Sequence, residues 1–251
     1  MQISQAIQNA SSMLNISPLE SAAQIRYNIP NDYRKGDNMR TYLFDFDGTL
    51  VDSMPTYKAV MLRVLDENGV SYPADIMKTI TPLGYAGTAK YYIENLGMRL
   101  SQEEIISTLH RYAIDEYTYN VPAKANVVEV LKALKARGDD LNVLTASPHA
   151  MLDPCLKRLG VYDLFTNIWS CEDFATTKAD PNIYHMAAEK IGEKVENILF
   201  LDDNYNADRV AKSAGMLVCG VYDDTSAEYV DEIKSVSDFY IYDFSELPDI
   251  W

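Results

Sequence analysis

The chain is 251 residues long with 47% apolar and 24% charged residues, which suits a globular protein with one large domain or with a domain that carries an insertion. Its formal net charge of −15 argues against binding of nucleic acid through a basic surface, because neutralising phosphates requires clustered lysine and arginine side chains. No apolar run approaches the roughly 20 residues that cross a bilayer, and the first residues lack a basic and an apolar signal region, so we expect a cytoplasmic protein without a membrane partner.

The first 38 residues differ in pattern from the rest of the chain. Apolar residues recur at helical spacing between Ile3 and Leu14, and Ser17–Glu20 resembles a capped helix start. Proline, glycine and asparagine residues then accumulate between Pro30 and Asn38, which is typical of a linker. We therefore expect residues 1–38 to form a helical accessory segment that ends in a linker.

The next segment is a short apolar strand that ends in two carboxylates. Thr41–Phe44 predicts a buried strand, and Asp45, Asp47 and Gly48 follow directly. Ligands of open α/β folds bind at the carboxyl ends of strands, so reactive residues are expected here. Two crowded carboxylates resist joint ionisation unless a cation lies near them, and a hard divalent ion with oxygen ligands fits this requirement.

Residues 55–121 carry an almost wholly helical pattern. Apolar residues recur every three or four positions, and glycine, proline and serine residues divide the segment into about four helices. No strand pattern of any strength occurs in it. Because the segment directly follows the strand that carries Asp45, we expect an inserted helical cap that lies over the strand ends as a lid.

From residue 122 onward the pattern alternates between helix and strand. Helices are expected near residues 125–137, 148–159, 180–191 and 206–214. Strands are expected over residues 141–145, 166–170, 197–201 and 217–221. Repeated βα units of this kind predict an α/β fold with a Rossmann-like, doubly wound parallel sheet. We assign residues 39–54 and 122–251 to this core domain and residues 55–121 to the helical cap domain.

Three further segments place polar residues beside predicted strands and helices. Thr145–Pro148 is either a helix cap or a turn whose hydroxyl and backbone N–H groups bind an anion. Lys178 lies just before a helix, where a cation would neutralise a phosphoryl group. Asp202 and Asp203 end the apolar run Ile198–Leu201, and two adjacent carboxylates at a strand end require charge compensation.

In combination, these motifs resemble the haloacid dehalogenase-like superfamily, in its phosphatase branch with an all-helical cap. Phosphoglycolate phosphatases and β-phosphoglucomutase-like proteins are similar. The resemblance covers about residues 40–222 and rests on four motifs in the family's order: Asp45–Ser53, Thr145, Lys178 before Asp180–Pro181, and Asp202–Asp203 followed by Ala214–Met216. Residues 1–38 are not a feature of the family, and Ala207 replaces a glycine that is usual in it.

The resemblance implies a role for each matching residue. Asp45 would be the nucleophile that forms an aspartyl-phosphate. Asp47 would protonate the leaving oxygen and then activate the water that hydrolyses this intermediate. Thr145 and the N–H group of Ala146 would hold the phosphoryl oxygens, and Lys178 would offset their charge.

The resemblance also implies Mg²⁺ as the cofactor. The ion would bind Asp45, the backbone carbonyl of Asp47 and Asp203, with Asp202 acting through water. A metal at this position would let a carboxylate approach an anionic substrate.

The expected activity is hydrolysis of a phosphomonoester in a small phosphorylated metabolite. Dehalogenase relatives lack an acid at the Asp47 position, and mutase relatives carry a histidine where Tyr57 stands. Two alternatives remain: a sugar phosphomutase of the β-phosphoglucomutase type, or a non-catalytic protein that binds a phosphorylated ligand. Tyr57, Tyr85 and the loop Leu83–Thr88 are candidates for substrate specificity, whereas the other aromatic residues of the cap are expected only to pack.

Overall fold

The computed structural model describes residues 39–251, so the predicted helical segment and linker in residues 1–38 lie outside the described residues. The described part contains a six-stranded, wholly parallel sheet in the order β3-β2-β1-β4-β5-β6. Its strands are β1 (Thr41–Phe44), β2 (Asp140–Thr145), β3 (Asn167–Ser170), β4 (Ile198–Asp202), β5 (Leu217–Val221) and β6 (Phe239–Ile241). The chain thus winds outward from β1 in both directions, which confirms the predicted doubly wound α/β fold.

Strand β1 lies inside the sheet between β2 and β4, and its side chains are buried on both faces. Tyr42, Leu43 and Phe44 are completely inaccessible to solvent. Leu43 belongs to a hydrophobic cluster with residues of α9 (Asn182–Ile191) and α10 (Tyr205–Ser213). The ring of Phe44 instead lies 6.3 Å from those of Phe165 and Phe244. This alternation between two covered faces is expected of a central parallel strand.

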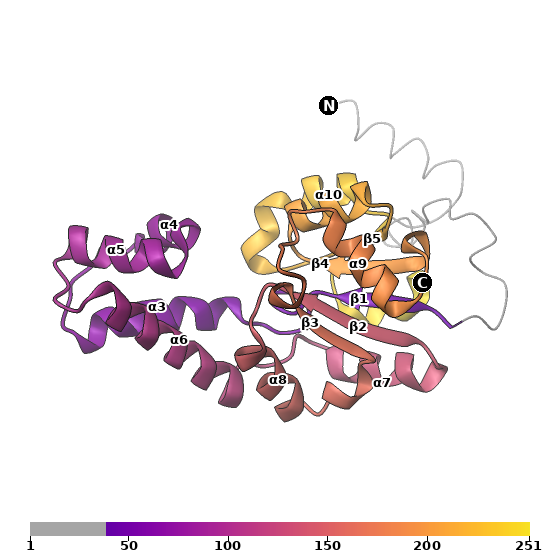
Figure 1. Cartoon of the computed structure of the whole chain (residues 1–251), viewed down its shortest axis with the longest axis horizontal. Coiled ribbons are helices and arrows are strands. Elements are labelled where there is room, and N and C mark those ends of the chain that lie inside the picture. The colour runs from indigo at the N-terminus through magenta and orange to yellow at the C-terminus, as the bar shows by residue number, and fades with distance from the viewer. Residues whose placement is uncertain (1–38) are drawn as a thin grey trace, which may run out of the picture. The chain divides into compact units, whose positions relative to one another are not determined.

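Helices cover both faces of the sheet. Besides α9 and α10, these are α7 (Val127–Arg137), α8 (His149–Arg158), α11 (Val230–Val236) and α12 (Leu247–Ile250). Figure 1 shows α7 and α8 on one side of the sheet and α10 on the other. Each strand therefore passes through a layered core, and its carboxyl end emerges at one edge, where the polar motifs follow.

The segment between β1 and α7 is helical and forms a group of its own in Figure 1. It contains α3 (Met54–Glu67), α4 (Ile76–Ile80), α5 (Gly84–Leu96) and α6 (Gln102–Tyr119), together with the single 3₁₀ turn η3 (Thr81–Leu83). The number of α-helices agrees with the prediction for this segment. Their apolar faces share a second hydrophobic cluster, which Met151 of α8 joins from the core side.

The predicted elements after residue 122 are all present, with ends that differ by a few residues. The sequence reasoning missed β6, which pairs with β5 at the edge of the sheet. A strand of three residues is too short to display a period, so only its neighbour reveals it. Within residues 39–251, no helix is both long and apolar enough to span a membrane.

Candidate functional site

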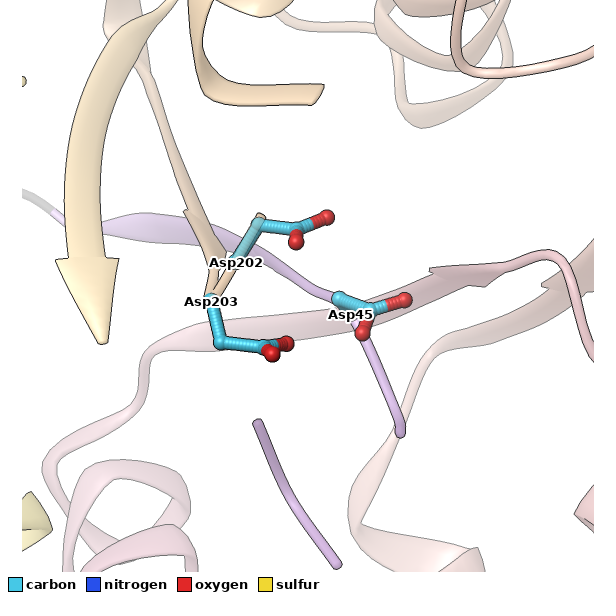
Figure 2. Close-up of side chains that lie close together, drawn as sticks. All are labelled: Asp45, Asp202 and Asp203. Atoms are coloured by element: carbon cyan, nitrogen blue, oxygen red, sulfur yellow. The ribbon is translucent and has the colours of Figure 1, made fainter. Parts of the chain in front are cut away.

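Three carboxylates converge at the carboxyl ends of the adjacent strands β1 and β4. Asp45 directly follows β1, and its backbone N–H group donates a hydrogen bond of 2.8 Å to the carbonyl of Leu201. Asp202 ends β4 and Asp203 follows, so the parallel register brings both acids beside Asp45. One carboxylate oxygen from each of the three residues lies within 4.8 Å of the others, and Figure 2 shows the side chains extending to the same side.

Lys178 provides a positive charge beside this acidic cluster. Its Nζ donates a hydrogen bond to Oδ1 of Asp45 and another, 2.8 Å long, to Oδ2 of Asp202. Burial lowers the pKa of Lys178, but the charges of Asp202 and Asp45 raise it well above the usual lysine value. Because its side chain is only 14% exposed and contacts two acids, Lys178 is a partly buried ion-pair partner of Asp45 and Asp202 rather than a solvated surface residue.

The cluster holds more negative charge than this lysine balances. Burial raises the pKa of Asp45 well above the usual carboxyl value; Lys178 opposes the rise, and Asp202 and Asp203 add to it. Burial and the charge of Asp202 likewise raise the pKa of Asp203 to about 7. Three carboxylates at this spacing form an oxygen donor set with uncompensated charge, which fits a hard divalent cation such as Mg²⁺.

The turn after Asp47 brings the backbone against Asp203. Gly48 has a φ of +76°, and a Cβ atom at this position would lie 2.5 Å from Oδ2 of Asp203. The hydroxyl of Thr49 donates a hydrogen bond of 3.3 Å to Oδ1 of the same carboxylate. Only glycine permits both the left-handed conformation and this close approach, so Gly48 has a structural reason to follow the two acids.

The side chain of Asp47 lies outside the group of three carboxylates. Because β1 ends at Phe44, the alternation of side chains along a strand does not continue to Asp47. Its Oδ1 accepts a hydrogen bond from the hydroxyl of Tyr117, and its Oδ2 accepts one from the hydroxyl of Ser147. The implied contact of Asp47 with the metal involves its backbone carbonyl, and that contact stays a prediction.

The residues predicted to bind phosphate occupy the end of β2 and the loop after it. Thr145 is buried, and its Oγ1 accepts a hydrogen bond of 3.0 Å from the backbone N–H group of Ser147. Ala146 between them is exposed. Helix α8 begins after Pro148 without a side-chain cap, and the Ser147 hydroxyl turns toward Asp47 instead. The geometry therefore disfavours the interpretation of this segment as a simple helix cap.

Sequence reasoning missed Lys124, which connects two separate parts of the site region. Its Nζ donates hydrogen bonds to the carbonyl of Gly48 at 2.7 Å, to the carbonyl of Tyr222 at 2.6 Å and to Oδ2 of Asp223 at 3.0 Å. These contacts join the turn after β1 to the segment after β5. No motif marks Lys124, because its role arises only from contacts between residues far apart in the sequence.

Tyr117 was also missed, and the expectation that such cap aromatics only pack is wrong for this residue. It lies in the last turn of α6, with its ring centroid 5.9 Å from that of Phe46. Its hydroxyl reaches Asp47. Tyr117 continues the helical spacing of the other apolar and aromatic residues of the cap, so the sequence offers no signal that separates it from them.

A cleft of about 700 Å³ lies between α3, α4 and the segments that follow β5 and β6. Tyr57 of α3 lines it, together with Lys124 and Tyr222 from outside the helical segment. Tyr85, the second aromatic specificity candidate, packs against His110 with ring centroids 4.8 Å apart. Burial raises the pKa of Tyr85 to about 12, with smaller electrostatic contributions from Tyr57 and Asp47.

Comparison with known proteins agrees with the resemblance found in the motifs. A sequence model of the haloacid dehalogenase-like hydrolases matches residues 39–215. YhcW of Bacillus subtilis, named as a candidate phosphatase, is 27% identical over 180 residues, which cover 71% of this chain and 81% of that protein. The phosphoglycolate phosphatase of Neisseria meningitidis is 27% identical over 190 residues, with coverages of 74% and 81%.

Solved structures show the same fold. A protein described as a candidate β-phosphoglucomutase of Thermotoga maritima has a TM-score of 0.73 to this chain at 22% sequence identity. The match covers 84% of this chain and 98% of that protein. At this level of identity the likeness concerns the architecture alone.

Proposed function

Because the chain belongs to the haloacid dehalogenase-like hydrolase family, we propose that it is a Mg²⁺-dependent phosphatase that cleaves small phosphorylated metabolites through an aspartyl-phosphate. Family membership and the phosphatase names of its relatives identify an enzyme that hydrolyses phosphate esters. The metal, the covalent intermediate and the size of the substrate are the proposed parts.

The observation that carries the proposal is the environment of Asp45. This carboxylate is buried at a strand end and accepts a hydrogen bond from Lys178. Its oxygens lie near those of Asp202 and Asp203, and the three carboxylates together could coordinate a metal ion. A carboxylate attacks an anionic phosphorus centre only where positive charge offsets their repulsion. An oxygen of Asp45 would form the bond to phosphorus while the ester oxygen leaves, and water would then cleave that bond and restore the carboxylate.

Proton transfer is assigned to Asp47. This residue lies two positions after Asp45 with its carboxylate held by two hydroxyl groups, apart from the acidic cluster. It would donate a proton to the leaving ester oxygen and then accept one from the attacking water. Thr145, the N–H group of Ala146 and Lys178 would bind the phosphoryl oxygens during both steps.

Mg²⁺ would be held by Asp45, Asp203 and the backbone carbonyl of Asp47, with Asp202 contributing through water. The support for this assignment is the oxygen donor set and its excess negative charge. When bound, the ion supplies positive charge that offsets the charge of the phosphoryl oxygens.

We further propose that residues 55–121 act as a cap domain over a core made of residues 39–54 and 122–251. Two hydrophobic clusters support this division, because helices α3 to α6 bury their apolar faces mainly against one another. The cleft lined by Tyr57 and Lys124 lies between the two groups and does not itself include Asp45 or Asp203. Lys124 also bonds the carbonyl of Gly48, so the cleft borders the turn after Asp47, where a cap would select the organic part of a substrate.

A phosphomutase is not favoured. It would need to return the phosphoryl group to the sugar, and Tyr57 stands where the mutase relatives have a histidine. The Bacillus subtilis and Neisseria meningitidis relatives carry phosphatase names. A non-catalytic binding protein is equally disfavoured, since every predicted catalytic position is filled.

The test is release of phosphate from p-nitrophenyl phosphate by purified protein with Mg²⁺, compared with the same protein in EDTA. We expect Asp45→Asn to abolish release, because an amide neither attacks phosphorus nor binds the metal as a carboxylate does. Asp231→Asn, at an exposed position on α11, is the matched control and should retain full activity. Full turnover by Asp45→Asn would contradict the assignment of the nucleophile, and full turnover in EDTA would contradict the metal.

A further inference from the structure

The two oxygens of the Asp47 carboxylate each accept a hydroxyl hydrogen bond, and the two donors come from different parts of the chain. The hydroxyl of Ser147, in the loop after β2, bonds Oδ2. The hydroxyl of Tyr117, in the last turn of α6, bonds Oδ1. Two donors on opposite oxygens fix the plane of a carboxylate, whereas one donor leaves it free to rotate.

Tyr117 is itself held firmly against the core. Its ring packs beside Phe46, which is completely buried next to Asp47. The side chain of Arg158 in α8 donates hydrogen bonds to the carbonyls of Tyr117, at 3.4 Å, and of Val121. These contacts with α8 hold the end of α6 in place, and with it the hydroxyl of Tyr117 that bonds Asp47. A side chain that orients another must itself be held in a fixed position.

We propose that Tyr117 is a positioning residue that, together with Ser147, aims the Asp47 carboxyl group at the leaving oxygen of the substrate. This inference rests on the proposed phosphatase function and adds to it a residue outside the four family motifs. A carboxylate has about four lone-pair sites, so one hydrogen bond on each oxygen leaves a site on each for the transferred proton. Correct orientation matters because a misplaced acid loses much of its effect on the barrier.

A purely structural role for the Tyr117 hydroxyl makes a different prediction. If it served only to fasten α6 to the core, its removal would affect every substrate to the same extent. An acid-positioning role instead affects substrates according to how much their leaving oxygen requires a proton. Nitrophenolate leaves without a proton, whereas the alkoxide of an alkyl phosphate does not.

The experiment compares Tyr117→Phe with the unmodified enzyme on p-nitrophenyl phosphate and on glycerol 2-phosphate, with Mg²⁺ present. The measured quantity is kcat/KM, which reports the step that expels the leaving group even when hydrolysis of the intermediate limits kcat. We expect kcat/KM to fall about 10-fold or more for glycerol 2-phosphate and less than about 3-fold for p-nitrophenyl phosphate. Phenylalanine retains the ring contact with Phe46, so only the hydroxyl is lost.

Tyr112→Phe is the matched control. Tyr112 lies on the same helix, and its hydroxyl also donates to a carboxylate, that of Glu67, away from the acidic cluster. Its removal should leave both kcat/KM values unchanged. Ser147→Ala removes the other donor to Asp47 and should reproduce the selective loss on the alkyl substrate, which keeps the idea testable if Tyr117→Phe does not fold.

Equal losses on both substrates in Tyr117→Phe, or no loss on either, would overturn the positioning role while leaving the phosphatase proposal intact. If the unmodified enzyme releases phosphate from neither of the two compounds, the proposed function is overturned, and the positioning role with it. If Tyr112→Phe shows the same selective loss on glycerol 2-phosphate, the positioning role of Tyr117 is also contradicted, because the loss would then arise from a general disturbance of α6.

Discussion

The absence of a side chain at Gly48 gives the carboxylate of Asp203 its place in the acidic site. The carboxylate of Asp203 occupies the space that a Cβ atom at position 48 would fill. The same carboxylate accepts a hydrogen bond from Thr49, so this turn and the end of β4 are fitted to each other. The identity of this one residue therefore controls the position of a predicted metal ligand.

We expect Gly48→Ala to reduce phosphatase activity roughly 100-fold, because displacing Asp203 disturbs the geometry of the whole acidic cluster. The measurement is kcat/KM with p-nitrophenyl phosphate, together with the Mg²⁺ concentration that gives half-maximal activity, which should rise. Gly97→Ala is the matched control: Gly97 has a φ of +70°, yet nothing lies within 4 Å of a Cβ atom there.

Both glycine variants adopt a strained left-handed backbone, which costs each about 1–2 kcal/mol of stability. Only Gly48→Ala adds the clash with Asp203. Equal activity in the two variants would show that the close approach at position 48 is unimportant.

At the scale of elements, α6 connects the helical segment to the site. It begins with a capping box in which the Ser101 hydroxyl accepts from the N–H group of Glu104, while the Glu104 carboxylate accepts from the N–H group of Ser101. It ends just after Tyr117, which reaches Asp47. One helix thus extends from an exposed cap to the centre of the proposed chemistry.

We expect Ser101→Ala to lower the free energy of unfolding by about 1 kcal/mol, because the N–H group at the helix start loses its partner. Urea denaturation followed by circular dichroism measures this loss. Ser107→Ala, an exposed position on the same helix, should change stability by less than about 0.5 kcal/mol. Activity should remain normal in both variants, and a strong loss of activity in Ser101→Ala would show that α6 is coupled to the site along its whole length.

At the scale of the whole molecule, the site concentrates negative charge on a chain that is already acidic. Burial and the nearby Asp202 raise the pKa of Asp203 to about 7, whereas an unfolded aspartate titrates near 4. Between these two pH values the folded protein binds a proton that the unfolded chain has released. This contribution to stability is therefore present at low pH and is lost as the pH rises through about 7.

We expect the metal-free protein to be less stable at pH 8 than at pH 5.5, as measured by urea denaturation at both values. Adding Mg²⁺ at pH 8 should restore stability, because an ion held by the proposed site of the folded state would neutralise the cluster. Asp203→Asn is the control and should make the metal-free protein less sensitive to pH over this range. A metal-free protein that is more stable at pH 8 would contradict the raised pKa of Asp203.

The sequence alone determined the doubly wound sheet and the four motifs, because both depend on local patterns: apolar runs for strands, helical spacing for helices, and polar residues directly after strands. It placed Asp45, Asp202 and Asp203 at the carboxyl ends of predicted strands, and the family resemblance implied that they share one metal site. The sequence did not distinguish a solvated surface lysine at position 178 from a residue of the site. The contacts of Lys178 with Asp45 and Asp202 made that distinction.

Only the tertiary structure decided what surrounds these motifs. Tyr117 and Lys124 acquire their roles from partners 70 and 76 residues away in the sequence, and nothing in their own neighbourhoods distinguishes them from packing or surface residues. The strand β6 likewise becomes visible only through its pairing with β5. A local pattern specifies which element forms, but a contact between distant segments depends on how all the elements pack, and that is set by the burial of the whole core.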